Sequence, residues 1–151
     1  MKPILRVQFG FLAVIAVIVV GFVRSCSADP SQLQLFEALT SMRADMDKVV
    51  VAGGRVLNYD NNGKTTFARV YLLLSVDADS RSQELLTRYK TVLISQGWVP
   101  VRASSRGLDL CKQGAMASVL ASNDDARLSV DMVFDAASAA LCVSHDHRTD
   151  R

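Results

Sequence analysis

The stretch Thr66–Val76, TFARVYLLLSV, decides the fold, because it is the longest run in the chain that alternates like a strand. Side chains at alternate positions of a strand point to opposite faces. One face carries Ala68, Val70, Leu72, Leu74 and Val76, and the other carries Phe67, Arg69, Tyr71 and Leu73. Because apolar residues occupy both faces, the pattern predicts a strand in the interior of a sheet.

A second strand is predicted just before this one. Val49–Val51 and Arg55–Tyr59 have strand character, with a bend at Gly53-Gly54 between them. Asn62-Gly63 then provides the two residues that a tight hairpin turn favours, since both positions need positive φ. We therefore expect an antiparallel hairpin.

A helix is predicted after the strand, from an N-cap at Asp79 or Ser80 to about Gln96. Its apolar stripe is Leu85, Leu86, Tyr89, Val92 and Leu93. Gly97 stands where a glycine ends a helix, and Trp98 is expected to pack as the next strand begins.

Four further strands are predicted from alternation and turn residues: Val99–Ala103, Leu108–Lys112, Ala115–Ala121 and Arg127–Asp135. From Ala136 the chain is first rich in alanine and then polar, and we expect a flexible polar tail over 144–151.

An N-terminal helix precedes these elements. Asp29-Pro30 offers one start, and Ser31 with Gln34 offers a competing capping box. The helical stripe comprises Leu35, Leu39, Met42, Met46 and Val49. It fits either a helix packed on its own domain or a short coiled coil beside a membrane.

Helix, hairpin, helix and a run of strands together predict an α+β fold. We expect an N-terminal transmembrane helix followed by a two-layer domain, with one or two helices packed on a mainly antiparallel sheet. The predicted division is a cytoplasmic stub and anchor at 1–24, a linker at 25–30, the domain at 31–143 and the tail at 144–151.

The anchor is the apolar run Val7–Val23, VQFGFLAVIAVIVVGFV, whose only polar member is Gln8. As a helix it would be about 26 Å long, close to the hydrocarbon thickness of a bilayer. Lys2 and Arg6 precede the run and Arg24 alone follows it. The positive-inside rule therefore predicts a cytoplasmic N-terminus and an extracytoplasmic domain, periplasmic if the cell is Gram-negative.

Three fates of this segment remain open: an uncleaved anchor, a cleaved secretory signal and a bacterial lipoprotein. Val23-Arg24-Ser25-Cys26 is similar to a lipobox at three positions and departs from it at Arg24. Cys26 would be the lipidated residue in that case. All three fates place the domain outside the cytoplasm.

The spacing Tyr89-x-x-x-Leu93-x-x-x-Gly97-Trp98, between a capped helix start and amphipathic strands, resembles a pattern of small membrane-anchored or lipoprotein-like bacterial envelope domains. The likeness covers about Thr66–Phe134. It implies a fold and a compartment, and it transfers no activity.

Charge argues against a nucleic-acid partner. Of 17 basic residues, Lys2, Arg6 and Arg24 flank the membrane segment, which leaves 14 against all 15 acidic residues. The domain is thus nearly neutral, whereas a nucleic-acid binder needs a basic stripe.

Two of the three cysteines, Cys111 and Cys142, lie in the domain, and an extracytoplasmic location would permit a disulfide between them. Two separate buried thiols are the alternative.

Few residues are candidates for metal binding or catalysis. His145-Asp146-His147 would present two imidazoles on one side if extended, but no third metal ligand is evident and a solvated tail is the simpler interpretation. Carboxylates such as Asp45 and Asp47 are interpreted as helix caps or turn formers. We predict no metal, no cofactor and no enzymatic activity.

The resulting hypothesis is a single-pass, membrane-anchored adaptor whose extracytoplasmic domain binds another envelope protein. The predicted surfaces are the strand around Arg69 and Tyr71 and the helix Ser31–Lys48. The alternatives are a membrane-held immunity or inhibitor protein and a metal-dependent binder or enzyme that uses the histidines.

Overall fold

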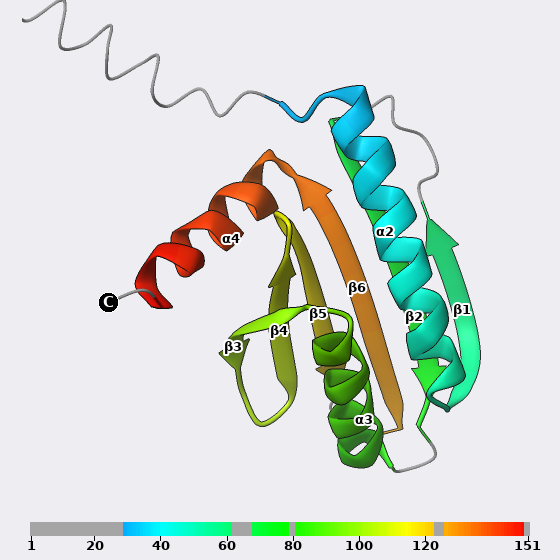
Figure 1. The fold of residues 1–151 in the computed structure, drawn as a ribbon. Coiled ribbons are helices and arrows are strands. Elements are labelled where there is room, and N and C mark those ends of the chain that lie inside the picture. The colour runs from blue at the N-terminus through cyan, green and yellow to red at the C-terminus, as the bar shows by residue number, and fades with distance from the viewer. Residues whose placement is uncertain (1–28, 62–67, 79–80, 123–125, 150–151) are drawn as a thin grey trace, which may run out of the picture.

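The computed structural model describes residues 29–61, 68–78, 81–122 and 126–149, and in these ranges the chain forms three helices and six strands (Figure 1). In chain order they are α2 Gln32–Val51, β1 Arg55–Asn61, β2 Arg69–Asp77, α3 Ser82–Ser95, β3 Val99–Ala103, β4 Gly107–Lys112, β5 Ala115–Ala121, β6 Arg127–Asp135 and α4 Ala136–Thr149. The predicted α+β class is confirmed for this part of the chain.

All six strands form one antiparallel sheet in the order β1-β2-β6-β5-β4-β3. The strand β2 lies between β1 and β6, which confirms its predicted interior position. The last strand, β6, inserts between β2 and β5 and joins the hairpin β1–β2 to the meander β3–β4–β5. The predicted turn at Asn62-Gly63 lies outside the described residues.

The helices α2 and α3 cover one face of the sheet (Figure 1). Side chains of β2 and β6 alternate strictly between buried and half-exposed, and the buried set points to these helices. The core beneath them includes Leu35, Met46, Tyr89, Trp98, Leu74, Leu110, Val119, Val130 and Met132. The expected two layers, with one or two helices, are incomplete as a description, because a third helix, α4 Ala136–Thr149, contacts β5 and β6 on the side away from α2 and α3.

The helix α2 begins with the capping box of Ser31 and Gln34, not at Asp29-Pro30. Its predicted stripe is buried throughout, which confirms the interpretation of a helix packed on its own domain. The predicted strand Val49–Val51 is wrong, because these residues form the last turn of α2. Val49 completes the helical stripe, and its burial against the core outweighs the β propensity of the valines.

The bend after α2 requires glycine. Gly53 and Gly54 have φ values of 122° and 88°, a region that other residues rarely adopt. A Cβ on Gly54 would lie 2.2 Å from Cγ1 of Val76, so β1 can leave the helix beside β2 only because position 54 has no side chain.

The helix α3 begins later than predicted. Arg81, rather than Asp79 or Ser80, occupies its N-cap position, and no side-chain hydrogen bond caps it there. The C-terminal prediction is confirmed: Gly97 has a φ of 88°, and the Trp98 amide donates to the Leu93 carbonyl at 3.1 Å. Tyr89, Leu93 and Trp98 are all buried, as their spacing predicted.

The C-terminal segment corrects another prediction, because α4 extends to Thr149 through most of the expected flexible tail. The helix starts with reciprocal hydrogen bonds: the Ser138 amide donates to Oδ1 of Asp135 at 2.7 Å, and the Asp135 amide donates to Oγ of Ser138 at 2.9 Å. This arrangement satisfies amides that a helix start otherwise leaves unpaired.

Within the described ranges, none of the helices has the length and apolar character needed to cross a bilayer. The predicted anchor Val7–Val23, the linker at 25–30 up to residue 28, and Cys26 lie outside those ranges.

Candidate binding surface

We call the side of the sheet opposite α2 and α3 the open face. It is built from alternate residues of the strands, whose partners on the other side are buried in the core. Its members are Arg55, Asn58, Asp60, Arg69, Tyr71, Leu73, Ser75, Asp77, Val99, Arg102, Asp109, Cys111, Met116, Ser118, Leu120, Arg127, Ser129, Asp131, Val133 and Asp135.

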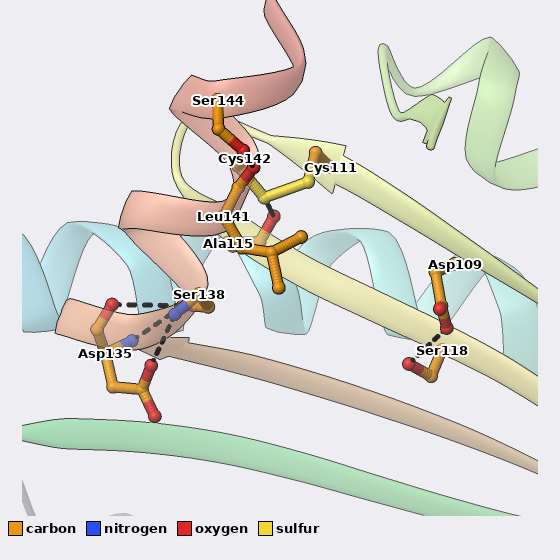
Figure 2. Close-up of a disulfide and its surroundings, with 9 residues drawn as sticks. All are labelled: Asp109, Cys111, Ala115, Ser118, Asp135, Ser138, Leu141, Cys142 and Ser144. Atoms are coloured by element: carbon orange, nitrogen blue, oxygen red, sulfur yellow. Dashed lines mark hydrogen bonds between the residues drawn. A yellow bond between two sulfur atoms is a disulfide. The ribbon is translucent and has the colours of Figure 1, made fainter. Parts of the chain in front are cut away.

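One end of the open face is covered by α4 (Figure 2). The sulfur atoms of Cys111 on β4 and Cys142 on α4 lie 2.00 Å apart, at disulfide-bonding distance, so the predicted pairing is confirmed. Leu110 and Lys112 point to the α2 side, and Cys111 between them therefore points to the open face. The link between Cys111 and Cys142 holds α4 over β4, β5 and β6.

Charged residues on this face occur mainly as cross-strand pairs. Arg69 Nε lies 3.5 Å from an Asp135 carboxylate oxygen, and Arg55 Nη2 lies 2.5 Å from Oδ2 of Asp77. Arg102 Nε lies 3.9 Å from Oδ2 of Asp109. The arginine side chains are well exposed, so each pair contributes only about 0–1 kcal/mol to stability.

The two residues singled out from the sequence, Arg69 and Tyr71, both lie on the open face. Arg69 pairs with Asp135, and the Tyr71 hydroxyl lies 3.4 Å from Oδ2 of Asp60, at the long end of hydrogen-bond range. The structure brings both side chains to the same strand face as Leu73, which is half-buried.

The middle of the open face is a row of polar residues in register across the strands. Asp109 lies opposite Ser118 and Ser118 lies opposite Asp131, which in turn lies opposite Leu73. The Ser118 hydroxyl donates to Oδ1 of Asp109 at 2.8 Å (Figure 2). The Ser118 hydroxyl therefore has one carboxylate on each side, that of Asp109 and that of Asp131.

Asp131 differs from the other carboxylates of the row. Its Oδ1 is buried and accepts no hydrogen bond from any described residue. Burial removes water from the ionised form and raises the pKa of this carboxyl above its usual 3.8. Asp131 is therefore a half-buried acceptor with unused capacity at the centre of the surface.

The predicted histidine cluster does not take the geometry assumed for it. His145–His147 belong to α4 and not to an extended strand. In the described ranges, no group of three metal-ligating side chains is present. His145 instead lines a shallow groove of about 810 Å³ between α4 and the strands β3 and β4, together with Lys112, Gln113 and the two bonded cysteines.

The helix-covered face contains a buried polar cluster, which corrects the prediction for Asp45. This residue was expected to be a cap or turn former, but it lies within α2 and is 4% exposed. Its Oδ2 accepts from Trp98 Nε1 at 2.9 Å and from Lys112 Nζ at 2.6 Å. The burial of Asp45 could have been predicted from its spacing. It follows Met42 by three residues and precedes Val49 by four, which places it on the buried stripe of the helix.

The outer side of α2, the second surface predicted from the sequence, exposes Leu33 and Phe36 near its N-terminus. These two side chains are neighbours one turn apart, and the only other large apolar residue that α2 exposes in the described chain is Val51 at its far end. A few exposed apolar residues are common on protein surfaces, so α2 provides a weaker case for binding than the open face.

The fold and the surface define an α+β domain in which α2 and α3 cover one face of a six-stranded antiparallel sheet and α4 covers one end of the other face. No family model matches the chain, and neither a curated protein nor a solved structure matches it. Function must accordingly be inferred from the geometry of this domain.

Proposed function

We propose that this protein is a non-enzymatic adaptor, anchored in a membrane by Val7–Val23, whose extracytoplasmic domain binds another envelope protein through the open face. The observation that carries the proposal is the centre of that face, which lies on the side away from α2 and α3. Half-buried apolar residues, Leu73 and Val133, lie there beside Oδ1 of Asp131, which has no hydrogen-bond partner among the described residues. Apolar side chains that flank a polar row, inside a rim of exposed charged pairs, form the mixed surface typical of protein interfaces that are not permanent.

The disulfide-bonding distance between Cys111 and Cys142 supports an extracytoplasmic location, because such bonds persist in oxidising compartments. The resemblance of the Tyr89 to Trp98 segment to anchored envelope domains points to the same compartment. A reporter that is active only outside the cytoplasm, fused after Arg151, tests this part of the proposal. An inactive fusion of normal abundance, together with activity of a cytoplasm-dependent reporter fused at the same position, would refute it.

Partner binding is tested by replacing one apolar residue of the open face. Leu73→Glu adds a charge beside Asp131 without touching the core under α2, and Leu33→Glu makes the same change on the outer side of α2. We expect purification from detergent-solubilised membranes to lose a specific co-purifying envelope protein with Leu73→Glu and to retain it with Leu33→Glu. Equal recovery with both variants at equal thermal stability would contradict the proposed surface.

A further inference from the structure

The strand β1 forms one edge of the sheet (Figure 1) and carries exposed apolar residues. Val56, Leu57 and Tyr59 are 42%, 46% and 41% exposed. In the described part of the chain, β1 pairs with β2 alone. An edge strand with apolar side chains is a template on which another strand can pair.

The opposite edge strand, β3, has a feature that hinders pairing with a further strand and that β1 lacks. Strand β3 carries Pro100, which has no N–H to donate to an incoming strand. Strand β1, with the sequence RVLNYDN, contains no proline and no lysine. The two edges therefore differ in their capacity to accept a further strand.

A bulge in β1 changes which side chains share a face. The register with β2 shifts between Val56 and Asn58, so that Arg55 lies opposite Asp77 and Asp60 lies opposite Leu73, both on the open face. In a regular strand, residues five apart point to opposite faces. The bulge thus brings Arg55 and Asp60 to one face, and it likewise brings Val56 and Tyr59 to the other.

We propose that β1 pairs antiparallel with β1 of a second copy of this chain, with Arg55 opposite Asp60 and Val56 opposite Tyr59. This register matches opposite charges on the open face and an aromatic with a β-branched residue on the helix side. Both kinds of cross-strand pair are stabilising. Leu57 and Asn58 meet at the two-fold axis, and each dimer contains every outer pair twice.

The geometry permits this pairing together with the existing contacts. Arg55 keeps its contact with Asp77, because a guanidinium has five N–H donors and can reach Asp60 of the second copy as well. The two-fold axis of an antiparallel pair runs perpendicular to the sheet. Both copies of α2 therefore lie on one side of the dimer, and both open faces lie on the other, free for a partner.

The register is tested by cysteine cross-linking of the full chain in detergent, with Cys26→Ser in the background and two different affinity tags. Copies with Val56→Cys and copies with Tyr59→Cys place their Cβ atoms about 5 Å apart in this register, close enough to form a disulfide. Two copies with Val56→Cys are offset along the strand by the span from Val56 to Tyr59, which the bulge reduces to two residues of the paired strand, about 7 Å. With the sideways separation of the strands, their Cα atoms lie about 8 Å apart, which is too far for a disulfide. We expect mild oxidation to link the mixed pair and to leave the Val56→Cys pair unlinked.

Charge reversal gives an independent measurement of the same contact. Arg55→Asp or Asp60→Arg alone should raise the dimer dissociation constant about tenfold, since two cross-strand pairs are lost in each dimer. The double variant restores both pairs with reversed polarity and should recover most of the affinity. A chain that sediments as a monomer in detergent, or equal cross-linking of the mixed and the Val56→Cys pairs, would overturn the proposal. Neither result would affect the proposed role of the open face.

Discussion

On the helix-covered face of the sheet, Asp45 is almost fully buried and accepts hydrogen bonds from Trp98 and Lys112. On the open face, Asp131 is half-buried and its Oδ1 has no donor among the described residues. The first carboxylate has two donors within its own chain, both at Oδ2, and ties α2 to β4 and to the segment after α3. The second lacks a partner at the centre of a surface. The contrast separates a face that maintains the fold from a face that is suited to binding.

The largest effect is expected on the helix-covered face. Lys112→Met removes the only cation within salt-bridge distance of Asp45 in the described chain and leaves its carboxylate buried without a counter-charge. Breaking a buried pair from one side costs about 3–5 kcal/mol. Urea unfolding should show this loss, whereas Lys90→Met on the exposed side of α3 should change stability by less than about 0.5 kcal/mol. If Lys112→Met lowered the free energy of unfolding only slightly, the Lys112–Asp45 pair would not be what holds α2 to the sheet on this face.

Removing the link between α4 and the sheet should have the next largest effect. The cysteines are separated by 31 residues, and the chain-entropy model assigns about 3–4 kcal/mol to a loop of that size. Cys142→Ser should therefore lower the midpoint of thermal unfolding, and a reducing agent should do the same to the unmodified protein. Cys26→Ser is the matched control and should leave the midpoint unchanged.

Unlike the two changes above, Asp131→Asn should raise the stability of the fold at neutral pH. Because burial raises the pKa of Asp131 in the folded state, its ionised form opposes folding once the pH exceeds that folded pKa. The neutral amide removes this cost, so the variant should unfold at a higher temperature at pH 7. The gain should shrink as the pH falls through the folded pKa and vanish below the unfolded value of 3.8, where both states are protonated.

Glu37→Gln makes the same change of charge on the exposed side of α2 and serves as the matched control. If Asp131→Asn proved destabilising at neutral pH, Asp131 would have a donor in the folded protein. The contrast with Asp45 would then fail.

The smallest effect on stability is expected for Arg69→Ala. The Arg69–Asp135 pair is exposed, so its loss should cost about 0–1 kcal/mol. The same substitution should weaken co-purification of the partner, because Arg69 belongs to the charged rim of the open face. A loss of several kcal/mol would assign Arg69 to the fold instead of the surface.

Local patterns predicted most of the elements correctly. Alternation located β3, β5 and β6, and the helical stripe of α2 and the glycine after α3 were also confirmed. The errors occurred where a tertiary contact outweighs local propensity. Val49–Val51 have the composition of a strand but belong to α2, because Val49 is buried in the core. The polar composition at the end of the chain gave no indication of α4, a helix that begins with the hydrogen bonds between Asp135 and Ser138.

The open face could be predicted only in part. Arg69 and Tyr71 were found because one strand shows which of its residues share a face. The row of Asp109, Ser118 and Asp131 depends on the insertion of β6 between β2 and β5, a long-range pairing that local periodicity does not encode. Asp45 could have been identified from its place in the helical stripe, but its donors Trp98 and Lys112 are distant in sequence.

Site-specific photocrosslinking in intact membranes tests the central claim most directly. A photoreactive amino acid at Leu73 samples the open face, and the same residue at Glu37 or Lys90 samples the outer sides of α2 and α3. The account predicts a discrete adduct with another envelope protein from position 73 and none from positions 37 and 90. An adduct from position 37 with none from position 73 would place binding on α2 and contradict the account.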